Sequence, residues 1–423
     1  MNIDINFLLP NIVLLLVYIL ITLEKLPRVV VALLGASLLL LFKIISQREA
    51  IQCIDFNVIF LLVGMMIIVN ILKETGGIRW LAIYTAKMVS GNGVLLMVYF
   101  CLLTAFISAF LDNVTTVLML GSVTIAIARD LKINPVPYLI TQTIASNIGG
   151  TATLIGDPPN IMIGSAANLD FNQFIINLAP IILLVLSVTT LTLYLIYKDQ
   201  LIISSASKKE LESMSLKGII KDRKLLSITL IIISLVIIGF FFHSALNLEA
   251  GTIALGGASI LLIFENKKHI WDDVEWTTIF FFIGLFIIVG AVEKVGTIHY
   301  LSELIFKLSN GNFETITIAL LWMSGIISAI IDNIPYTATM IPLIKNLGNH
   351  YTNLEPLWWS LALGACLGGN GTLIGASANI VIADMANKSK HPITFIEFLK
   401  VGSIITLESL VICSMYLWFR YLR

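Results

Sequence analysis

The chain has 423 residues, of which 58% are hydrophobic and only 12% are charged, and its mean hydropathy is +0.95. This number of apolar side chains cannot fit inside the core of one soluble domain. Lipid is therefore expected to cover much of the surface. The 26 basic and 26 acidic residues balance, and no nucleic acid partner is expected. The four cysteines form no CxxC pair, and no cofactor or metal site is expected.

Apolar segments of membrane-spanning length recur along the whole chain. In the first half they predict helices at residues 8–24, 27–46, 56–73 and 174–197, a helical hairpin at 94–130 and a glycine-broken helix at 138–168. An amphipathic connection precedes the hairpin. No basic residue occurs before Lys25, so the first segment is predicted to be a mature helix and not a cleaved signal peptide.

The second half of the chain repeats the first at an offset of 219 to 222 residues. The matching blocks are 35–40 with 257–262, 59–64 with 279–284, 108–113 with 328–333, and 149–156 with 368–375. Chance similarity among apolar residues would not hold one offset through blocks with matching Gly, Asp and Asn. The sequence therefore predicts a first repeat at 1–197, a polar linker at 198–224 and a second repeat at 225–423.

Each repeat is predicted to cross the membrane an odd number of times, about five, which inverts the second repeat relative to the first. The expected fold is an all-α polytopic membrane protein of two inverted repeats, each with about five spanning helices, a re-entrant hairpin and a glycine-broken helix. A cytoplasmic linker places 19 Lys and Arg residues inside and 7 outside, as the positive-inside rule demands. Both termini are then expected outside the cell membrane.

The broken helix contains the segment Gly-Gly-Thr-Ala-Thr-Leu-Ile-Gly-Asp-Pro-Pro-Asn at 149–160. Backbone can leave the helix within a bilayer only where protein or a wet cavity satisfies its polar groups. Close helix packing on glycine is the alternative interpretation, but it would not need the proline pair and the polar run. The candidate binding residues here are Gly149, Gly150, Thr151, Thr153, Asp157 and Asn160, and in the second repeat Gly369, Asn370, Gly371, Thr372 and Asn379.

The two hairpins carry Asp-Asn pairs near the middle of apolar stretches. Two interpretations are open, a re-entrant tip that ends in mid-membrane or a simple turn in water. The short arm at 114–128 and the repetition of the acid favour the re-entrant tip. An acid held in mid-membrane is a functional candidate. The candidate residues are Asp112, Asn113, Thr115, Thr116, Asp332, Asn333 and Thr337.

Four acids are candidates for coupling transport to protons: Asp112, Asp332, Asp157 and Glu408. Burial disfavours a charged carboxylate and a bound cation favours it, so such a group can exchange protons for metal ions. The repeat partner of Asp157 is Ala376, which makes the two halves chemically unequal. Glu408 lies in the final apolar segment, where a structural role is an equally good interpretation.

The blocks Leu-Asp-Asn-Val-Thr-Thr at 111–116 and Asn-Ile-Gly-Gly-Thr-Ala-Thr-Leu-Ile-Gly-Asp-Pro-Pro-Asn at 147–160 resemble signatures of the arsenite permease, sodium/proton antiporter and melanocyte P-protein group. This group belongs to the ion transporter superfamily, and the resemblance covers nearly the whole chain. It implies inverted repeats whose re-entrant hairpins and interrupted helices meet at a central site. Dicarboxylate carriers of the superfamily typically have Ser-Asn-Thr at the tips, where this chain has Asp-Asn-Val and Asp-Asn-Ile, so citrate or succinate uptake is not favoured.

The sequence therefore predicts a secondary transporter that exports a small inorganic solute of the arsenite type, driven by membrane potential or a proton gradient. The motifs contain no Arg or Lys, which fits a neutral hydroxide better than a multiply charged anion. Sodium/proton antiport is the alternative, and an anion or dicarboxylate symporter is less favoured. The expected partners are the lipid bilayer and the small inorganic ion or neutral hydroxide, and a homodimer is left open.

Other classes of protein fit the sequence less well. An intramembrane hydrolase would need a motif such as HExxH or GxSxG, which the sequence lacks, so an enzyme is not expected. A channel fits inverted halves around broken helices less well than alternating access does.

Overall fold

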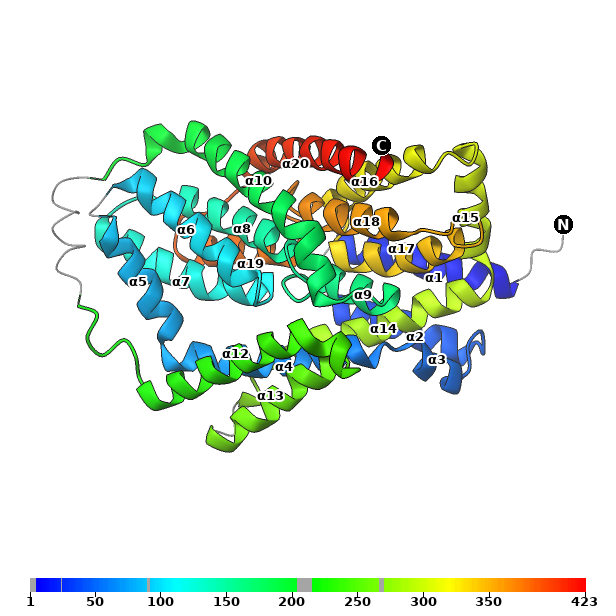
Figure 1. Cartoon of the computed structure of the whole chain (residues 1–423), viewed down its shortest axis with the longest axis horizontal. Helices are drawn as coiled ribbons and strands as arrows, with labels where there is room; N and C mark the ends of the chain where they lie inside the picture. The colour runs from blue at the N-terminus through cyan, green and yellow to red at the C-terminus, as the bar shows by residue number, and fades with distance from the viewer. Residues whose placement is uncertain (1–4, 24, 90–91, 204–214, 266–269) are drawn as a thin grey trace.

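The computed structural model describes residues 5–23, 25–89, 92–203, 215–265 and 270–423, and in these ranges the chain is helical without strands (Figure 1). The all-α polytopic membrane fold is thereby confirmed. Residues 204–214 of the predicted linker lie outside the described residues. Seven helices in these ranges are long and apolar enough to cross a membrane: α1 (Ile5–Thr22), α4 (Phe56–Thr75), α7 (Asn113–Leu131), α10 (Phe171–Tyr197), α12 (Arg223–Leu246), α14 (Trp276–Lys294) and α16 (Phe313–Ile330).

The remaining helices are mostly shorter, although the last of them has 23 residues. They include one helix of each hairpin and both helices of each broken helix. They are α2 (Arg28–Leu41), α3 (Gln47–Cys53), α5 (Gly77–Met88), α6 (Gly93–Ser108), α8 (Val136–Thr151), α9 (Pro158–Ala167), α13 (Ala250–Phe264), α15 (Thr297–Leu308), α17 (Asn333–Leu347), α18 (Glu355–Gly368), α19 (Ser377–Lys388) and α20 (Phe395–Leu417). The sequence analysis did not anticipate α3, which begins with a capping box between Ser46 and Glu49.

The order of helices repeats along the chain. Helices α4 to α10 have counterparts α14 to α20, and the starting residues of paired helices differ by 220 for α4 and α14 (276 minus 56), by 219 for α8 and α18 (355 minus 136) and by 224 for α10 and α20 (395 minus 171). The amphipathic helices α5 and α15 run across the direction of their neighbours at opposite ends of the molecule (Figure 1). The inverted orientation of the two repeats is consistent with this arrangement and stays a prediction.

The two predicted repeats exchange helices. α2 of the first repeat packs on α14 of the second, and α13 of the second packs on α4 of the first. Both crossings need a glycine, because a Cβ on Gly64 would lie 2.6 Å from the backbone of Ala254 and one on Gly284 would lie 2.8 Å from the backbone of Ala32. Small residues let helix backbones approach closely in membranes. The two contacts occupy equivalent positions in the repeats, since Gly284 follows Gly64 by 220 residues.

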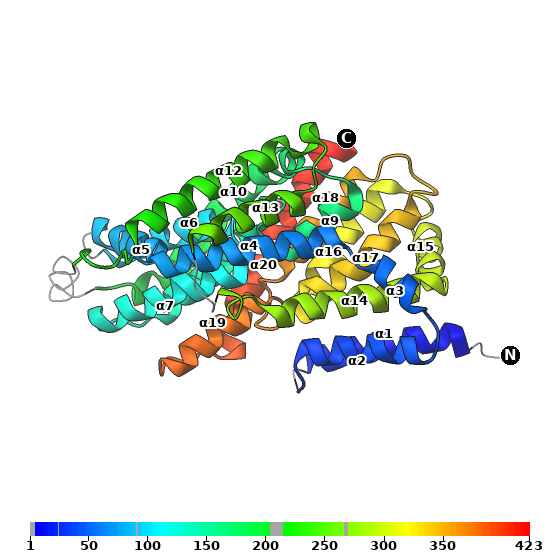
Figure 2. The same cartoon turned by 90° about the horizontal axis from the view of Figure 1, so that it is seen from below.

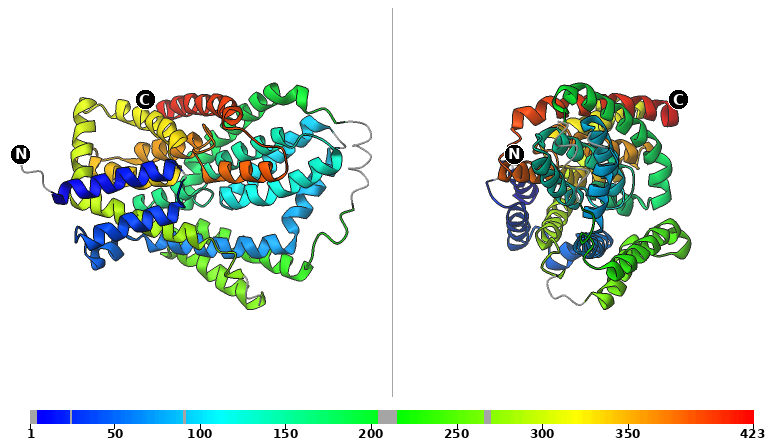
Figure 3. Two further views of the ribbon diagram at one scale, coloured as in Figure 1. Left: turned by 180° about the vertical axis from the view of Figure 1, so that it is seen from behind. Right: turned by 90° about the vertical axis from the view of Figure 1, so that its left-hand side faces the viewer.

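The flanks of the bundle expose apolar side chains. α1 and α2 lie along one edge of the bundle, and α12 lies along the other (Figure 2). The end view also places α12 on a different flank from α1 and α2 (Figure 3). Only 22% of the apolar stretch of α1 and 28% of that of α12 is buried, against 61% for α4. Leucines 230 and 235 of α12 are examples of exposed large side chains. These faces are the ones that lipid would cover.

Candidate functional site

Each hairpin turns at an Asp-Asn pair that begins its second helix. Asp112 is the N-cap of α7, and its Oδ1 accepts a hydrogen bond from the Thr115 amide at 2.8 Å. Asp332 is the N-cap of α17, and its Oδ1 accepts from the Ile334 amide at 3.0 Å. Asp is favoured here because its carboxylate satisfies amides that the first helical turn leaves unpaired. The two acids therefore shape the hairpin tips in addition to any role in binding.

The first broken helix is interrupted between α8 and α9. Pro158 and Pro159 occupy the first positions of α9, where the helix needs no amide donor. The side chain of Asn160 bridges the gap, because its Nδ2 donates to the carbonyl oxygens of Thr151 at 3.1 Å and Thr153 at 2.8 Å. This amide satisfies carbonyl groups that the helix end leaves without an intrahelical partner.

The second broken helix is built in the same way. Between α18 and α19, the Nδ2 of Asn379 donates to the carbonyl oxygens of Gly369 and Thr372, both at 2.7 Å. Each break is also tied to its hairpin: the hydroxyl of Thr153 donates to the carbonyl of Ala109, and that of Thr372 donates to the carbonyl of Ala329. The hairpins and breaks therefore form one polar assembly in the interior.

Asp157 joins the two hairpin tips. It is fully buried at the start of α9, and its side chain makes no capping bond within its own helix. Its Oδ1 accepts from the Nδ2 of Asn113 at 3.3 Å, and the Nδ2 of Asn333 lies 3.3 Å from both of its carboxylate oxygens. A buried acid is costly unless such donors surround it. One carboxylate of the first repeat thus contacts the tips of both hairpins.

Asn147 of α8 extends this network into the second repeat. Its Oδ1 accepts from Asn113 at 3.1 Å, and its Nδ2 donates to the Oδ1 of Asn370 at 2.9 Å and of Asn379 at 3.0 Å. Buried hydrogen bonds of this kind hold the elements that they join in one arrangement, even though the Nδ2 of Asn370 has no partner among the described residues. Asn147 therefore fixes both broken helices and the first hairpin relative to one another.

A cavity of about 410 Å³, here called the central cavity, opens onto this network. This volume is in the range of sites for small molecules. Both hairpin tips, the start of α9, the loop before α14 and the start of α2 contribute to its wall. Its polar lining residues are Arg28, Asp112, Asn113, Asp157, Glu275, Thr277, Thr278, Asn333 and Ser377.

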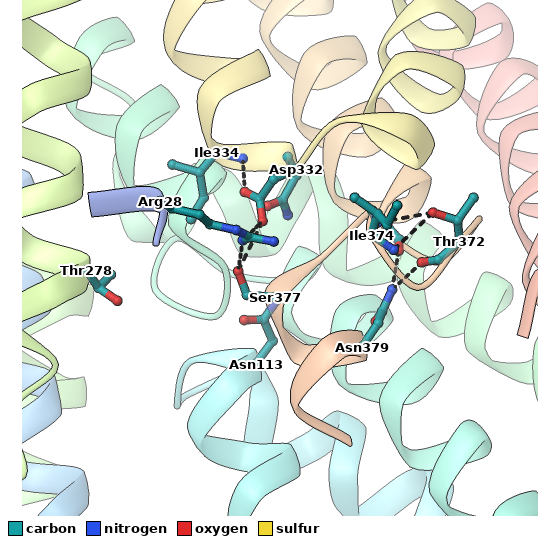
Figure 4. Close-up of polar contacts among 12 residues, drawn as sticks. Arg28, Asn113, Thr278, Asp332, Ile334, Thr372, Ile374, Ser377 and Asn379 are labelled. Atoms are coloured by element: carbon teal, nitrogen blue, oxygen red, sulfur yellow. Dashed lines mark hydrogen bonds and ion pairs between the residues drawn. The ribbon is translucent and has the colours of Figure 1, made fainter. Parts of the chain in front are cut away.

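Arg28 is the one basic residue among the described residues that line the cavity. Its Nη1 donates to the Oδ2 of Asp332 at 2.5 Å and to the hydroxyl of Ser377 at 2.7 Å, and that hydroxyl lies 3.0 Å from the same Oδ2 (Figure 4). Asp332 is only 1% exposed, and this ion pair places an opposite charge beside the buried carboxylate. The lining thus holds the three carboxylates of Asp112, Asp157 and Glu275 and one guanidinium, that of Arg28. This guanidinium is already paired with Asp332, which lies behind the lining.

This arrangement adds one residue to the sequence argument. The charge count includes Arg28 among the residues on the cytoplasmic side, and the hairpin and broken-helix motifs contain no Arg or Lys. The motifs alone therefore miss Arg28, which extends from the first turn of α2 into the central cavity. Glu275 and Asn147 were also missed as site residues. Asn147 stands in the motif at 147–160, but only the fold reveals its partners.

The structure separates the predicted residues into three groups. Those that line the central cavity are Asp112, Asn113, Asp157 and Asn333. Those that build the walls behind it are Gly149, Gly150, Thr151, Thr153, Asn160, Asp332, Gly369, Asn370, Gly371, Thr372 and Asn379. Thr115 contributes its amide to Asp112, and the hydroxyls of Thr116 and Thr337 are buried without a hydrogen-bond partner among the described residues.

Glu408 lies away from the central cavity. It sits on α20, where its two carboxylate oxygens accept hydrogen bonds from Thr189 at 3.1 Å and Thr192 at 2.8 Å, both on α10. These contacts join the last helices of the two repeats. They favour the structural interpretation of Glu408 over a role in coupling.

Known proteins resemble this chain over almost its full length. A family model described as "Citrate transporter" (CitMHS) matches residues 18–364. The chain is 39% identical over 414 residues to an uncharacterized transporter of Mycobacterium tuberculosis, Rv2684, and 38% identical over 415 residues to a 46 kDa membrane protein of Mycobacterium leprae, with 96% of each chain covered. It is 33% identical over 489 residues to the P protein of Homo sapiens, covering 95% of this chain and 58% of the P protein. The chain belongs to the CitMHS citrate transporter family.

Proposed function

We propose that this membrane transporter, which is not an enzyme, is a proton-coupled secondary carrier and that Asp157 is its coupling carboxylate. The observation that carries the proposal is the contact of this one buried acid with the tips of both hairpins. A carboxylate in such a place can bind either a proton or a cation, and the exchange of one for the other couples their movements.

The charge of the central cavity favours a small cation as the exchanged ion. Its lining holds Asp112, Asp157 and Glu275, and the guanidinium of Arg28 is already paired with Asp332. This excess of carboxylates attracts sodium and repels a multiply charged anion. Sodium/proton antiport, the alternative in the sequence analysis, therefore becomes the leading activity, and free citrate is disfavoured despite the description of the family.

Export of a neutral hydroxide of the arsenite type is the second candidate. It is favoured by the amide groups of Asn113 and Asn333 and the hydroxyl of Thr278, which line the cavity and can hydrogen-bond an uncharged solute. In this case protonated carboxylic acids would face the substrate, and the membrane potential or a proton gradient would drive its export.

The topology belongs to the same proposal. Inverted repeats with re-entrant hairpins would let the two halves rock around the central cavity and open it to one side at a time. The linker at 198–224 is proposed to be cytoplasmic and both termini to be outside, in accordance with the distribution of Lys and Arg.

The test is proton movement in proteoliposomes on addition of sodium, lithium, arsenite, antimonite or citrate. Sodium or lithium should drive protons across the membrane in the wild type, and Asp157→Asn should abolish this flux while the protein remains folded. Asp384→Asn is the matched control, because Asp384 is exposed and paired with Lys388 on the surface of α19. Proton movement with citrate alone, or an unchanged flux in Asp157→Asn, would contradict the proposal.

A further inference from the structure

A second cavity, of about 420 Å³, lies where the end of the predicted linker packs against the bundle. The end of α4, the start of α5, α7, α19 and the segment before α12 form its wall. We call it the basic cavity, because its charged lining residues are Lys73, Arg79 and Lys221. Leu118 of α7 lines both this cavity and the central cavity, so the two are neighbours.

The fold holds the three basic residues together from three different segments. Lys73 stands in the last turn of α4, Arg79 in the first turn of α5, and Lys221 on the segment that leads to α12. The amide of Lys221 donates to the carbonyl of Thr75 at 2.9 Å. Gly76 allows this close approach, because it has a φ of +78° and a Cβ there would lie 2.2 Å from the carbonyl oxygen of Ile219.

The cavity has an unbalanced positive charge. Its lining contains three cations and no carboxylate, and none of the three makes an ion pair with another of the described residues. The general excess of Lys and Arg on one side of a membrane explains basic residues on this surface. This general excess does not explain why three basic residues line one cavity whose lining contains no carboxylate. Three converging cations suit a phosphate group.

Most of the remaining lining of the basic cavity is apolar. It consists of Ile78, Leu118, Met119, Val123, Ile219 and Met385. A free phosphate ion would make no favourable contact with these apolar side chains. A phospholipid, in contrast, can place its phosphate beside the cations and its acyl chains along the apolar side chains. Basic pockets between helices at a membrane surface are suited to anionic lipid headgroups in this way. We infer that the basic cavity binds an anionic phospholipid through its phosphate.

A lipid in this place would act on transport. The cavity lies between α4 and α5 on one side and α7 and α19 on the other, and the latter two helices follow a hairpin tip and a helix break of the central site. A phosphate bound to Lys73 would hold α7 and α19 against α4.

The inference can be tested by lipid binding to the purified full-length chain. Native mass spectrometry would count bound phosphatidylglycerol and phosphatidylcholine for the wild type and for a Lys73→Gln, Arg79→Gln, Lys221→Gln triple variant. Phosphatidylglycerol should bind the triple variant at least about tenfold more weakly, since each cation near the surface contributes about fivefold. Binding of phosphatidylcholine should not change. Arg79→Gln alone should weaken phosphatidylglycerol about fivefold, which keeps the test decisive if the triple variant does not fold.

The matched control is the triple variant Lys217→Gln, Lys224→Gln, Lys400→Gln, which removes the same charge from residues outside the cavity lining. It should bind phosphatidylglycerol as the wild type does. Equal loss in the two triple variants would overturn the inference, because general surface charge would then explain the binding. The last experiment is competition with inorganic phosphate. If millimolar phosphate displaces phosphatidylglycerol, the ligand is a free phosphate and the lipid assignment is wrong.

Discussion

Replacing Gly149 by alanine should separate two helices that meet at the site. A Cβ on Gly149 would lie 2.1 Å from the carbonyl oxygen of Ala105 and 2.5 Å from its Cα. These are backbone atoms of α6 and cannot rotate away. Real Cβ contacts are essentially never shorter than 3.0 Å, so α8 and α6 must move apart by about 0.9 Å (3.0 minus 2.1).

The expected loss of folding stability is the cost of overpacking minus the gain in helix propensity from replacing glycine by alanine. Overpacking of this kind costs about 1–3 kcal/mol. Alanine gains back at most about 1 kcal/mol over glycine in the interior of a helix. The same displacement would stretch the hydrogen bond of 2.8 Å from the Ser108 hydroxyl of α6 to the Ser146 carbonyl of α8 to about 3.7 Å, beyond hydrogen-bonding distance. Gly149→Ala should therefore lower both stability and transport.

The measurement is the apparent melting temperature in detergent, together with substrate-dependent proton flux in proteoliposomes. Gly368→Ala should behave similarly, because a Cβ there would lie 2.4 Å from the carbonyl oxygen of Gly325. Gly256→Ala in α13 is the control: nothing lies within 4 Å of its Cβ, and it should be neutral or slightly stabilising. If Gly149→Ala melts and transports like Gly256→Ala, the helix contact is not as close as described and the reasoning fails.

Three further substitutions probe the polar site. Asn147→Ala removes a donor to two asparagines and should lower the free energy of unfolding by roughly 1–3 kcal/mol, measured by thermal unfolding; an unchanged melting temperature would contradict the network. Arg28→Gln leaves the buried Asp332 unpaired, and should destabilise more than the double variant Arg28→Gln, Asp332→Asn; equal destabilisation would mean that the pair contributes nothing. Glu408→Gln should keep proton-coupled flux at the wild-type pH dependence, and a lost or shifted dependence would return Glu408 to the coupling machinery.

The sequence predicts the spanning helices well because lipid imposes their length and composition. It also locates the first break, since Pro158 and Pro159 cannot continue a helix that begins before them, whereas Gly149 and Gly150 remain helical at the end of α8. The predicted helix at 138–168 corresponds to α8 and α9 within two residues at either end. The short helix α3 was missed because its signal is a local capping box and not an apolar run.

Contacts between distant segments are the part that the sequence could not supply. A count of charges places Arg28 near a membrane surface, but it cannot tell that the side chain turns inward to reach Asp332, which is 304 residues further along the chain. The pattern around Asn147 identifies a broken helix without revealing that this amide joins Asn370 and Asn379. Both facts depend on how the repeats pack against each other, and local patterning does not encode that.

The exchange of α2 and α13 between the repeats has a consequence for biosynthesis. The ribosome releases residues 56–75 long before residues 250–264, so α4 must wait in the translocon or the lipid without the helix that later covers it. Its glycine face at Gly64 remains open to chaperones and proteases during that interval. A chain truncated at the linker should therefore be degraded in cells, whereas the two halves produced together should rescue each other.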